Sequence, residues 1–414
     1  MELDSHQLIS VDITLRNDHD TNGTFMSSFT TGDIIEGTVC LLASKDVRFD
    51  NIEISFIGQE TTNLRSSNPS KGYLQFQNFE QQLDESALPD PRILKKNQKY
   101  QFPFAFTVVD YLPASSCHHP TVNSVVRTAH LQPPPTFGDA TVSGFGGKLR
   151  DDFAPSTCRI TYAIRVKLNR LAIVSGKQET ILSKERKVRI KPAVDEAPPL
   201  VNMSTFHQEY TLHHREIIRD PRSKESLGEL AVTLEQPKSF RLPLRDPHSL
   251  VSQAVRFMLR YTPIDPNTAV PQLKFVRGKL TSTTFYSATF YNDFPTKKKD
   301  FLGRPLNFCE TKFPPFEYTI PQLEWKQDET GIYSAILLVP VVLSRENFIP
   351  TFHSCLMSRI YKLSFEFAVH KAKSFSLRTP IQISAERDAS VLPSYNASVR
   401  VIEGPGRQSG YQSL

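Results

Sequence analysis

The sequence predicts an all-β protein made of antiparallel sandwiches, and three observations indicate this fold class. Apolar and polar residues alternate with period two in many short stretches, which is typical of strands with one buried face. Turn-forming residues are frequent, with 30 Pro and 17 Gly, while long helical periodicity is hard to find. At 414 residues the chain is too long for one small domain and fits two sizeable ones.

The clearest strand is expected at residues 360–369. Ile360, Lys362, Ser364 and Glu366 alternate there with an apolar face formed by Tyr361, Leu363, Phe365, Phe367 and Val369. Pro350 comes shortly before this stretch and has no backbone N–H for a sheet ladder. Residues 349–352 are therefore expected at a sheet edge or at the beginning of the strand. We expect residues 360–369 to form the central strand of the second half of the chain.

The first half of the chain contains a series of further alternating stretches. Gly32 and Asp33 mark a turn before the second of them, and Gly58 is expected to end the third. Residues 59–98 and 113–158 show no pattern and are expected to be long irregular segments. The predicted strands cover residues 8–15, 34–42, 52–58, 102–108, 160–168 and 187–191.

Residues 191–200 are the best candidate for a domain boundary. They contain three prolines and three charged residues, which favours a stiff and exposed connector. We therefore expect one sandwich over residues 1–191, a linker over 192–204, a second sandwich over 205–385 and a flexible tail over 386–414. The second sandwich is expected to contain a long polar insertion at 292–324 and strands at 230–234, 251–259, 273–284, 285–291, 331–342, 360–369 and 381–383.

The net charge of +6 includes three basic clusters, at Lys95–Lys96, at 184–191 and at 297–299. Two interpretations remain open for them. They are solvated strand ends and loops, as most surface charge is, or they attract acidic lipid heads and phosphorylated protein tails. On the second interpretation the contacts are Lys95, Lys96, Lys297, Lys298 and Lys299. Nucleic acid is disfavoured as a partner, because no basic stripe is interleaved with aromatic residues.

The cysteines and the hydropathy pattern favour the cytoplasm. The five cysteines are scattered and form no Cys-x-x-Cys pair, which argues against a disulfide framework and a zinc ribbon. The first residues show no basic-then-apolar signal segment. The longest apolar run, at 333–343, contains Pro340 and is too short to cross a membrane.

Three arrangements that suggest chemistry are weaker than their structural interpretations. Cys117, His118, His119 and His130 are expected to lie in one irregular loop without the spacing of a metal finger. Cys355 lies near His353, but a thiol–imidazole nucleophile also needs an oxyanion hole that the sequence does not indicate. The glycines at 144–148 do not match a phosphate-binding loop. We therefore predict no catalytic, cofactor or metal residue, and a protein that is not an enzyme.

Across both halves, the sequence resembles the arrestin superfamily, and within it the fungal alpha-arrestin-like proteins. The ordered set of motifs extends over roughly residues 8–385, and the most specific of them spans residues 349–361. The others are Gly32-Asp33-x-x-x-Gly37, Ile52 to Gly58, Phe102 to Phe106 with Leu112-Pro113, Cys117-His118, and Asp151-Asp152 before Ile160 to Val166. The resemblance implies two arrestin-type, immunoglobulin-like β-sandwich domains in tandem about a short linker.

The resemblance also implies an adaptor function carried on loops and tails. Leu392, Pro393 and Tyr395 resemble the ligand of WW domains, although this motif has Leu-Pro where Pro-Pro is usual. In alpha-arrestins such a motif recruits a HECT-type ubiquitin ligase. The implied protein is cytoplasmic, is recruited to the plasma membrane or endosomes, and binds the cytosolic tails of transporters or receptors to promote their ubiquitination and endocytosis.

Two other functions are alternatives to this adaptor. A structural sorting-coat subunit, like the arrestin-fold component of retromer, needs no ligand for a ubiquitin ligase. An extracellular adhesion sandwich is disfavoured by the missing signal segment and by the unpaired cysteines.

Overall fold

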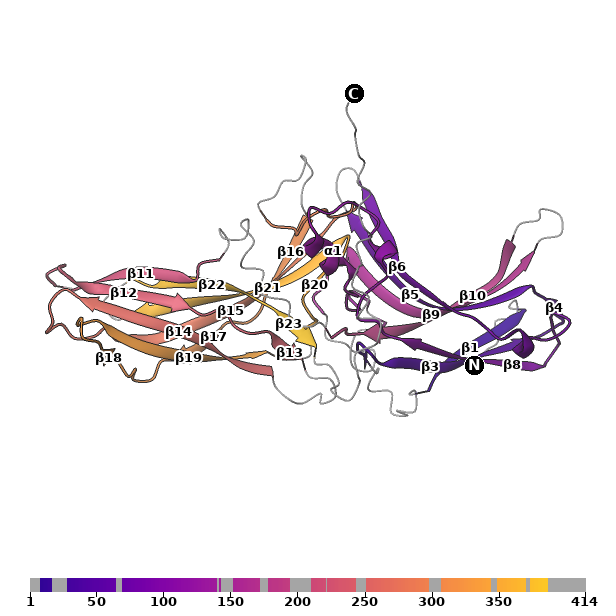
Figure 1. Ribbon diagram of the computed structural model, residues 1–414, viewed down its shortest axis with the longest axis horizontal. Coiled ribbons are helices and arrows are strands. Elements are labelled where there is room, and N and C mark those ends of the chain that lie inside the picture. Colours follow the sequence, from indigo (N-terminus) through magenta and orange to yellow (C-terminus); the bar gives the residue numbers. More distant parts are fainter. Residues whose placement is uncertain are drawn as a thin grey trace, which may run out of the picture.

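The protein is all-β, with short helical segments between strands. The computed structural model describes residues 8–16, 28–64, 69–139, 141–142, 152–171, 178–193, 210–220, 222–242, 251–297, 307–343, 348–369 and 373–385. Its strands form two lobes side by side along the long axis, each with its own sheets (Figure 1). Each lobe also has its own hydrophobic core.

The first lobe places a three-stranded sheet, in the order β1-β3-β8, against a five-stranded sheet, in the order β2-β10-β9-β5-β6. All pairs are antiparallel except β10 with β2. The three-stranded sheet consists of β1 (Ile9–Leu15), β3 (Ile34–Ala43) and β8 (Lys99–Thr107). The five-stranded sheet consists of β2 (Ser28–Phe29), β5 (Asn51–Leu64), β6 (Ser70–Gln81), β9 (Cys158–Leu171) and β10 (Gln178–Ile190). A small pair is formed by β4 (Val47–Arg48) and β7 (Ile93–Leu94), and the helical segments are η1 (Glu85–Ala87), η2 (Ala114–Ser116) and α1 (Ser124–Leu131).

The second lobe also stacks two sheets. One has the order β11-β12-β14-β19-β18, and the other has the order β16-β15-β21-β20, with β17 also paired to β15 and β22 to β21. The first contains β11 (His213–Arg219), β12 (Ser226–Leu234), β14 (Val251–Pro263), β18 (Lys326–Gln327) and β19 (Tyr333–Leu343). The second contains β15 (Leu273–Tyr286), β16 (Asn307–Lys312), β17 (Phe316–Thr319), β20 (Phe352–His353), β21 (Met357–Val369) and β22 (Phe375–Ile381), while β13 (Phe240–Leu242) pairs in parallel with β23 (Ile383–Ala385).

Strand β21 confirms the expected central strand of the second half. It pairs along most of its length with β15 on one side and with β22 on the other. The predicted apolar face is buried, and Phe365 meets Phe257 of the opposite sheet edge to face, with ring centroids 5.0 Å apart. Ile360 was expected on the wet face but is buried against Phe285, because the N-terminal end of β21 is covered on both faces.

The prediction for residues 59–98 was wrong. Strand β5 continues through Gly58 to Leu64 and forms a long hairpin with β6. Gly58 does not end the strand; it leaves room for the ring of Phe76, which a Cβ at this position would approach to 2.3 Å. The apolar alternation disappears beyond Gly58 because polar residues, among them Glu60 and Thr62, are buried there.

The other corrections concern element types. Residues 113–158 contain helix α1. Asn123 caps its first turn, because the Asn123 side chain accepts a hydrogen bond from the N–H of Val126. Residues 273–284 belong to one strand that ends at Tyr286, and no second strand follows at 287–291. The insertion at 292–324 contains β16 and β17, and β11 was not predicted. The predicted linker over 192–204 lies almost wholly outside the described residues, so this boundary stays a prediction.

Among the described residues, none of the helices is long and apolar enough to span a membrane.

The first prediction concerns the importance of β21. We expect Phe365→Ala to destabilise the second lobe by about 3–5 kcal/mol, because the side chain is fully buried between the two sheets. The measurement is equilibrium unfolding in urea. Glu366→Ala, at an exposed position on the same strand, is the control and should change the stability by less than about 0.5 kcal/mol. Equal effects of the two substitutions would contradict a central role for β21.

Candidate functional site

The candidate site lies where the two lobes meet, and it is built around residues 348–361, which we call the bridging segment. Phe348 and Tyr361, at its two ends, belong to the core of the second lobe. The middle of the segment belongs to the core of the first lobe, through Ile349, Phe352, Cys355, Leu356 and Met357. The hydroxyl of Tyr361 donates a hydrogen bond of 2.9 Å to the carbonyl of Ile349, which closes the segment into a loop.

Glu60 of β5 binds this loop from the first lobe. Its carboxyl group is fully buried and lies 2.5 Å from the hydroxyl of Ser354. That hydroxyl also accepts a hydrogen bond from the N–H of Met357 and lies 3.0 Å from the Met357 carbonyl. A serine hydroxyl has one proton to donate. When Glu60 is charged, that proton serves either the carboxylate or the Met357 carbonyl, but not both. When Glu60 is protonated, its O–H donates to Ser354, the serine proton binds the carbonyl, and all three contacts are satisfied.

The electrostatics of Glu60 agree with this protonated form. Burial raises the pKa of Glu60 from 4.5 to about 7, and hydrogen bonds that Ser354 and the Leu356 backbone can donate to the charged carboxylate partly offset that rise. The side chain is therefore neutral in the folded protein over a pH range in which it is charged in the unfolded chain.

Arg359 is the second buried polar residue at the junction. Its side chain is fully buried, and its guanidinium donates hydrogen bonds to the carbonyl of Phe153 and to the hydroxyls of Thr284 and Tyr361. The guanidinium also lies over the ring of Phe137, at 5.2 Å from its centroid. Because Phe137 and Phe153 come from the first half of the chain, Arg359 connects the two lobes.

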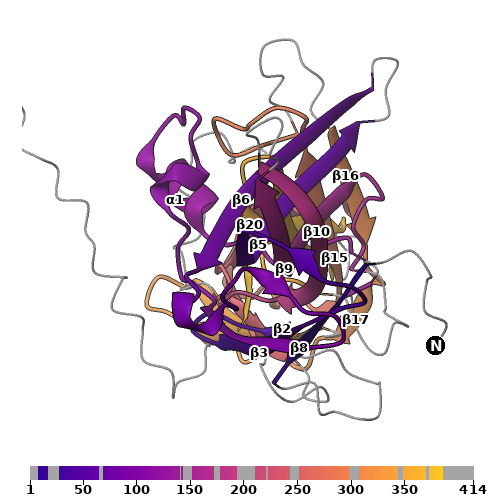
Figure 2. The same cartoon turned by 90° about the vertical axis from the view of Figure 1, so that its right-hand side faces the viewer.

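Helix α1 lies at the boundary between the lobes, beside the sheets of the first lobe (Figures 1 and 2). Val126 of this helix packs against Phe294 of the second half in a small hydrophobic cluster. Just before the helix, the N–H of Val122 donates a hydrogen bond of 2.8 Å to the carbonyl of Asn292. The helix therefore adds a second contact between the halves.

Four side chains with metal-ligating atoms meet beside α1. They are Cys117, His119, His130 and Cys355, and one ligand atom of each lies within 4.8 Å of the others. The Sγ atom of Cys117 is 3.5 Å from Nε2 of His119 and 3.8 Å from Nδ1 of His130. Cys117 follows η2, His130 lies on α1, and Cys355 lies in the turn between β20 and β21. We call these four residues the Cys–His cluster.

The surroundings of the two imidazoles set their orientation and charge. The His119 ring stacks on Phe290, at 4.8 Å between centroids, and its Nδ1 lies 3.1 Å from the carbonyl of Pro120. Burial, with a smaller contribution from His119, lowers the pKa of His130 to about 4, so this imidazole is neutral at pH 7.

The structure brings some of the residues considered in the sequence together and separates others. Cys117, His119 and His130 meet as neighbours, whereas His118 lies outside the cluster. His353 contacts Ser358 through Nδ1 at 2.6 Å and packs against Phe294. Sequence reasoning missed Glu60, Arg359 and the placement of Cys355 beside His130.

The predicted lysine contacts do not form one site. Lys95 and Lys96 are exposed between β7 and β8 in the first lobe. Lys297 forms an ion pair with Glu310 and lies 5.7 Å from the ring centroid of Phe308, close to β16. Lys298, Lys299 and the motif at 392–395 lie outside the described residues.

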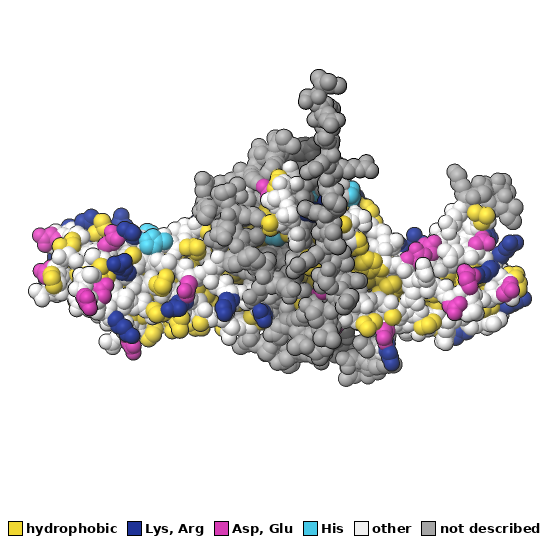
Figure 3. Space-filling model, in the orientation of Figure 1, with side chains coloured by type: hydrophobic (Ala, Val, Ile, Leu, Met, Phe, Trp, Pro, Cys, Tyr) yellow, Lys and Arg dark blue, Asp and Glu magenta, His cyan; other side chains and the backbone are white. Residues whose placement is uncertain are grey.

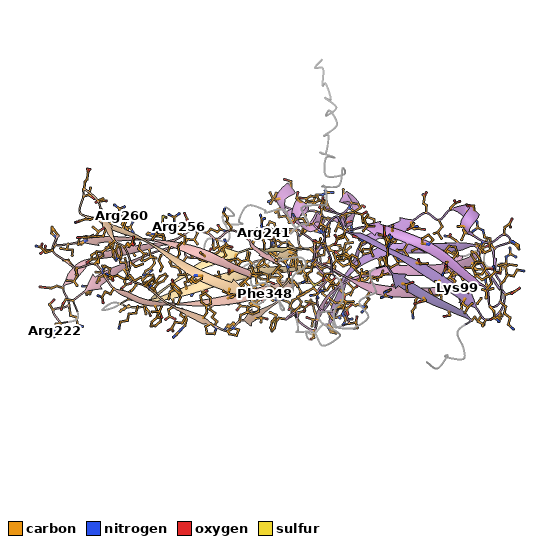
Figure 4. The ribbon with its side chains drawn as sticks, turned by 90° about the horizontal axis from the view of Figure 1, so that it is seen from below. Lys99, Arg222, Arg241, Arg256, Arg260 and Phe348 are labelled. Atoms are coloured by element: carbon orange, nitrogen blue, oxygen red, sulfur yellow. The ribbon has the colours of Figure 1, made fainter. Side chains whose placement is uncertain are left out.

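A second candidate surface is an apolar stripe on the outer face of β14 and β19. Four of its side chains are between 42% and 54% exposed, namely Met258, Ile336, Leu338 and Val342. Met258 pairs with Ile336 and Arg256 with Leu338 across the two strands. Arg256 and Arg260 project from β14 on this side (Figure 4). In Figure 3, hydrophobic side chains gather on the lower part of the left-hand lobe, where Figure 1 labels β14 and β19. We call these six residues the outer stripe.

Comparison with models of protein families finds no match, and comparison with curated proteins finds no match either.

The second prediction concerns the protonation of Glu60. Because the folded-state pKa is raised, its contribution to stability is fully present below pH 4.5 and is lost as the pH rises to about 7. Glu60→Gln removes this loss. We expect the free energy of unfolding of Glu60→Gln, minus that of the unsubstituted protein, to increase by about 3 kcal/mol from about pH 4.5 to pH 8.

Urea unfolding across this pH range measures the effect. Glu80→Gln, at an exposed position on the paired strand β6, is the control and should leave the pH dependence unchanged. A Glu60→Gln protein that retained the pH dependence of the unsubstituted protein would show that Glu60 is charged in the fold.

Proposed function

We propose that the protein is a non-catalytic, arrestin-like adaptor. It binds the cytosolic tails of membrane transporters or receptors and brings a WW-domain ubiquitin ligase of the HECT type to them. Such an adaptor acts from the cytoplasm at the plasma membrane or endosomes and promotes ubiquitination, endocytosis and sorting of its cargo.

The single observation that carries this proposal is the outer stripe. Its four apolar side chains are about half exposed and lie together on two paired strands, and contiguous patches of this kind are common at binding sites. The stripe lies on paired strands, so its side chains are held in a fixed order. Arg256, which is paired with Glu235 at 3.6 Å, and Arg260 border it, and this basic edge fits a tail that combines apolar and acidic residues.

The ligase-binding element of the proposal is the sequence Leu392-Pro393-Ser394-Tyr395, which follows β23 along the chain. A WW domain receives such a peptide in a polyproline conformation, with the proline and the tyrosine against an aromatic groove. This motif separates the adaptor from the alternative, a sorting-coat subunit, which does not need it.

The third prediction tests the ligase-binding motif in the full chain. We expect a WW domain of a HECT-type ligase to bind the unsubstituted protein, and Tyr395→Ala to reduce the binding to background. Tyr411→Ala, which changes another tyrosine of the same tail, is the matched control and should bind normally. Fluorescence anisotropy with a labelled WW domain measures the affinity. Equal binding by the two variants would leave the sorting-coat subunit as the better proposal.

The fourth prediction tests the outer stripe as the cargo surface. Leu338→Glu places a charge among exposed apolar side chains and should abolish binding to immobilised peptides from the cytosolic tails of membrane proteins. Leu42→Glu, at a similarly exposed position on β3 of the other lobe, should bind as the unsubstituted protein does. If Leu338→Glu retained binding to every tail that the unsubstituted protein recognises, the stripe would not be the cargo surface.

A further inference from the structure

The Cys–His cluster combines the ligand types of a tetrahedral zinc site. Two thiols and two imidazoles form an S₂N₂ set, which in proteins favours Zn²⁺. The ligands come from three separate parts of the chain that converge on one point. Spacing within residues 117–130 does not indicate a metal site, because Cys355 joins the other three ligands only in the folded protein.

The distances within the cluster fit a metal at its centre. With Zn–S bonds of about 2.3 Å and Zn–N bonds of about 2.0 Å, sulfur and nitrogen ligands of a tetrahedron lie about 3.5 Å apart. The Sγ of Cys117 lies 3.5 Å from Nε2 of His119 and 3.8 Å from Nδ1 of His130. These two edges of the tetrahedron are therefore already close to the required lengths.

The neighbours of His119 support a ligand role for it. Ligating histidines usually donate their second ring N–H to an oxygen, which fixes the tautomer. The Nδ1 of His119 is within hydrogen-bonding distance of the Pro120 carbonyl, which places the proton on Nδ1 and leaves a lone pair on Nε2, the atom 3.5 Å from the Sγ of Cys117. Stacking on Phe290 holds the plane of the ring.

The burial of the cluster is compatible with a bound Zn²⁺ ion. Cys117, His130 and Cys355 are between 1% and 3% exposed, and both cysteines are free thiols. Two thiolates and two neutral imidazoles around Zn²⁺ have no net charge, so the complete site leaves no uncompensated charge in the interior. A disulfide between Cys117 and Cys355 would remove both thiolate ligands, so His119 and His130 could not complete a four-ligand zinc site.

We propose that Cys117, His119, His130 and Cys355 bind a structural Zn²⁺ ion that fastens the α1 region of the first lobe to the bridging segment of the second. All four positions of the tetrahedron are filled by protein, which is the mark of a structural site rather than a catalytic one. The inference does not depend on the adaptor function, because it concerns how the lobes are held together.

The fifth prediction is that the full chain, expressed with zinc in the medium and purified without chelators or a metal-affinity tag, contains about one zinc per molecule. Mass spectrometry of the metal content measures this. Cys117→Ala and Cys355→Ala should each lose the bound zinc. Cys158→Ala, which removes a free and equally buried thiol of the same lobe outside the cluster, and His118→Ala should keep it.

A second measurement covers ligand variants that fail to fold. Chelator treatment of the unsubstituted protein should lower its melting temperature, and Zn²⁺, but not Mg²⁺, should restore it. Reloading with Co²⁺ should give the visible absorption of a tetrahedral site and a sulfur-to-cobalt charge-transfer band. A zinc-free protein that acquires no Co²⁺ spectrum, control variants that lose zinc as the ligand variants do, or a Cys117–Cys355 disulfide under non-reducing mass spectrometry would each overturn the proposal.

Discussion

The structure depends on one packing constraint, which is that the core of the first lobe is completed by the bridging segment of the second. Five apolar side chains of that segment are buried there, among them Phe352 and Met357. Burying a large apolar side chain contributes about 1.5–3 kcal/mol, so the segment stabilises the first lobe substantially. Its two ends remain anchored in the other core through Phe348 and Tyr361. Figure 4 shows Phe348 at the boundary. The two cores are thus joined by covalent chain as well as by surface contact.

The polar groups at the junction are explained by the same constraint. A loop that enters a core must satisfy its own backbone, and Ser354 and Tyr361 do so by hydrogen bonds within the segment. Glu60 and Arg359 then connect the loop to the first half of the chain, one through a carboxyl group whose pKa is raised and the other over an aromatic ring. Buried polar groups of this kind contribute little net stability but restrict how the surfaces fit.

The sequence predicted strand positions well where one face of the strand is exposed to solvent. Residues 361–369 and 160–168 show this alternation, and both lie in the observed strands. Prediction failed near the junction, because residues there are covered on both faces and polar side chains occupy buried positions, as Glu60 and Thr62 do. The Cys–His cluster was not predictable for another reason. Cys355 meets His130 only through the tertiary fold, and no local spacing carries that information.

The bridging segment also has a consequence for synthesis on the ribosome. A nascent chain that has emerged only as far as β19 carries every strand of the first lobe but lacks Ile349 to Met357. Its first core therefore has an unfilled apolar surface until the last part of the chain is made, since domains usually begin to fold from the N-terminus during translation. Translation products that end before Phe348 would present that surface to chaperones and proteases, which gives the cell a means of removing incomplete copies.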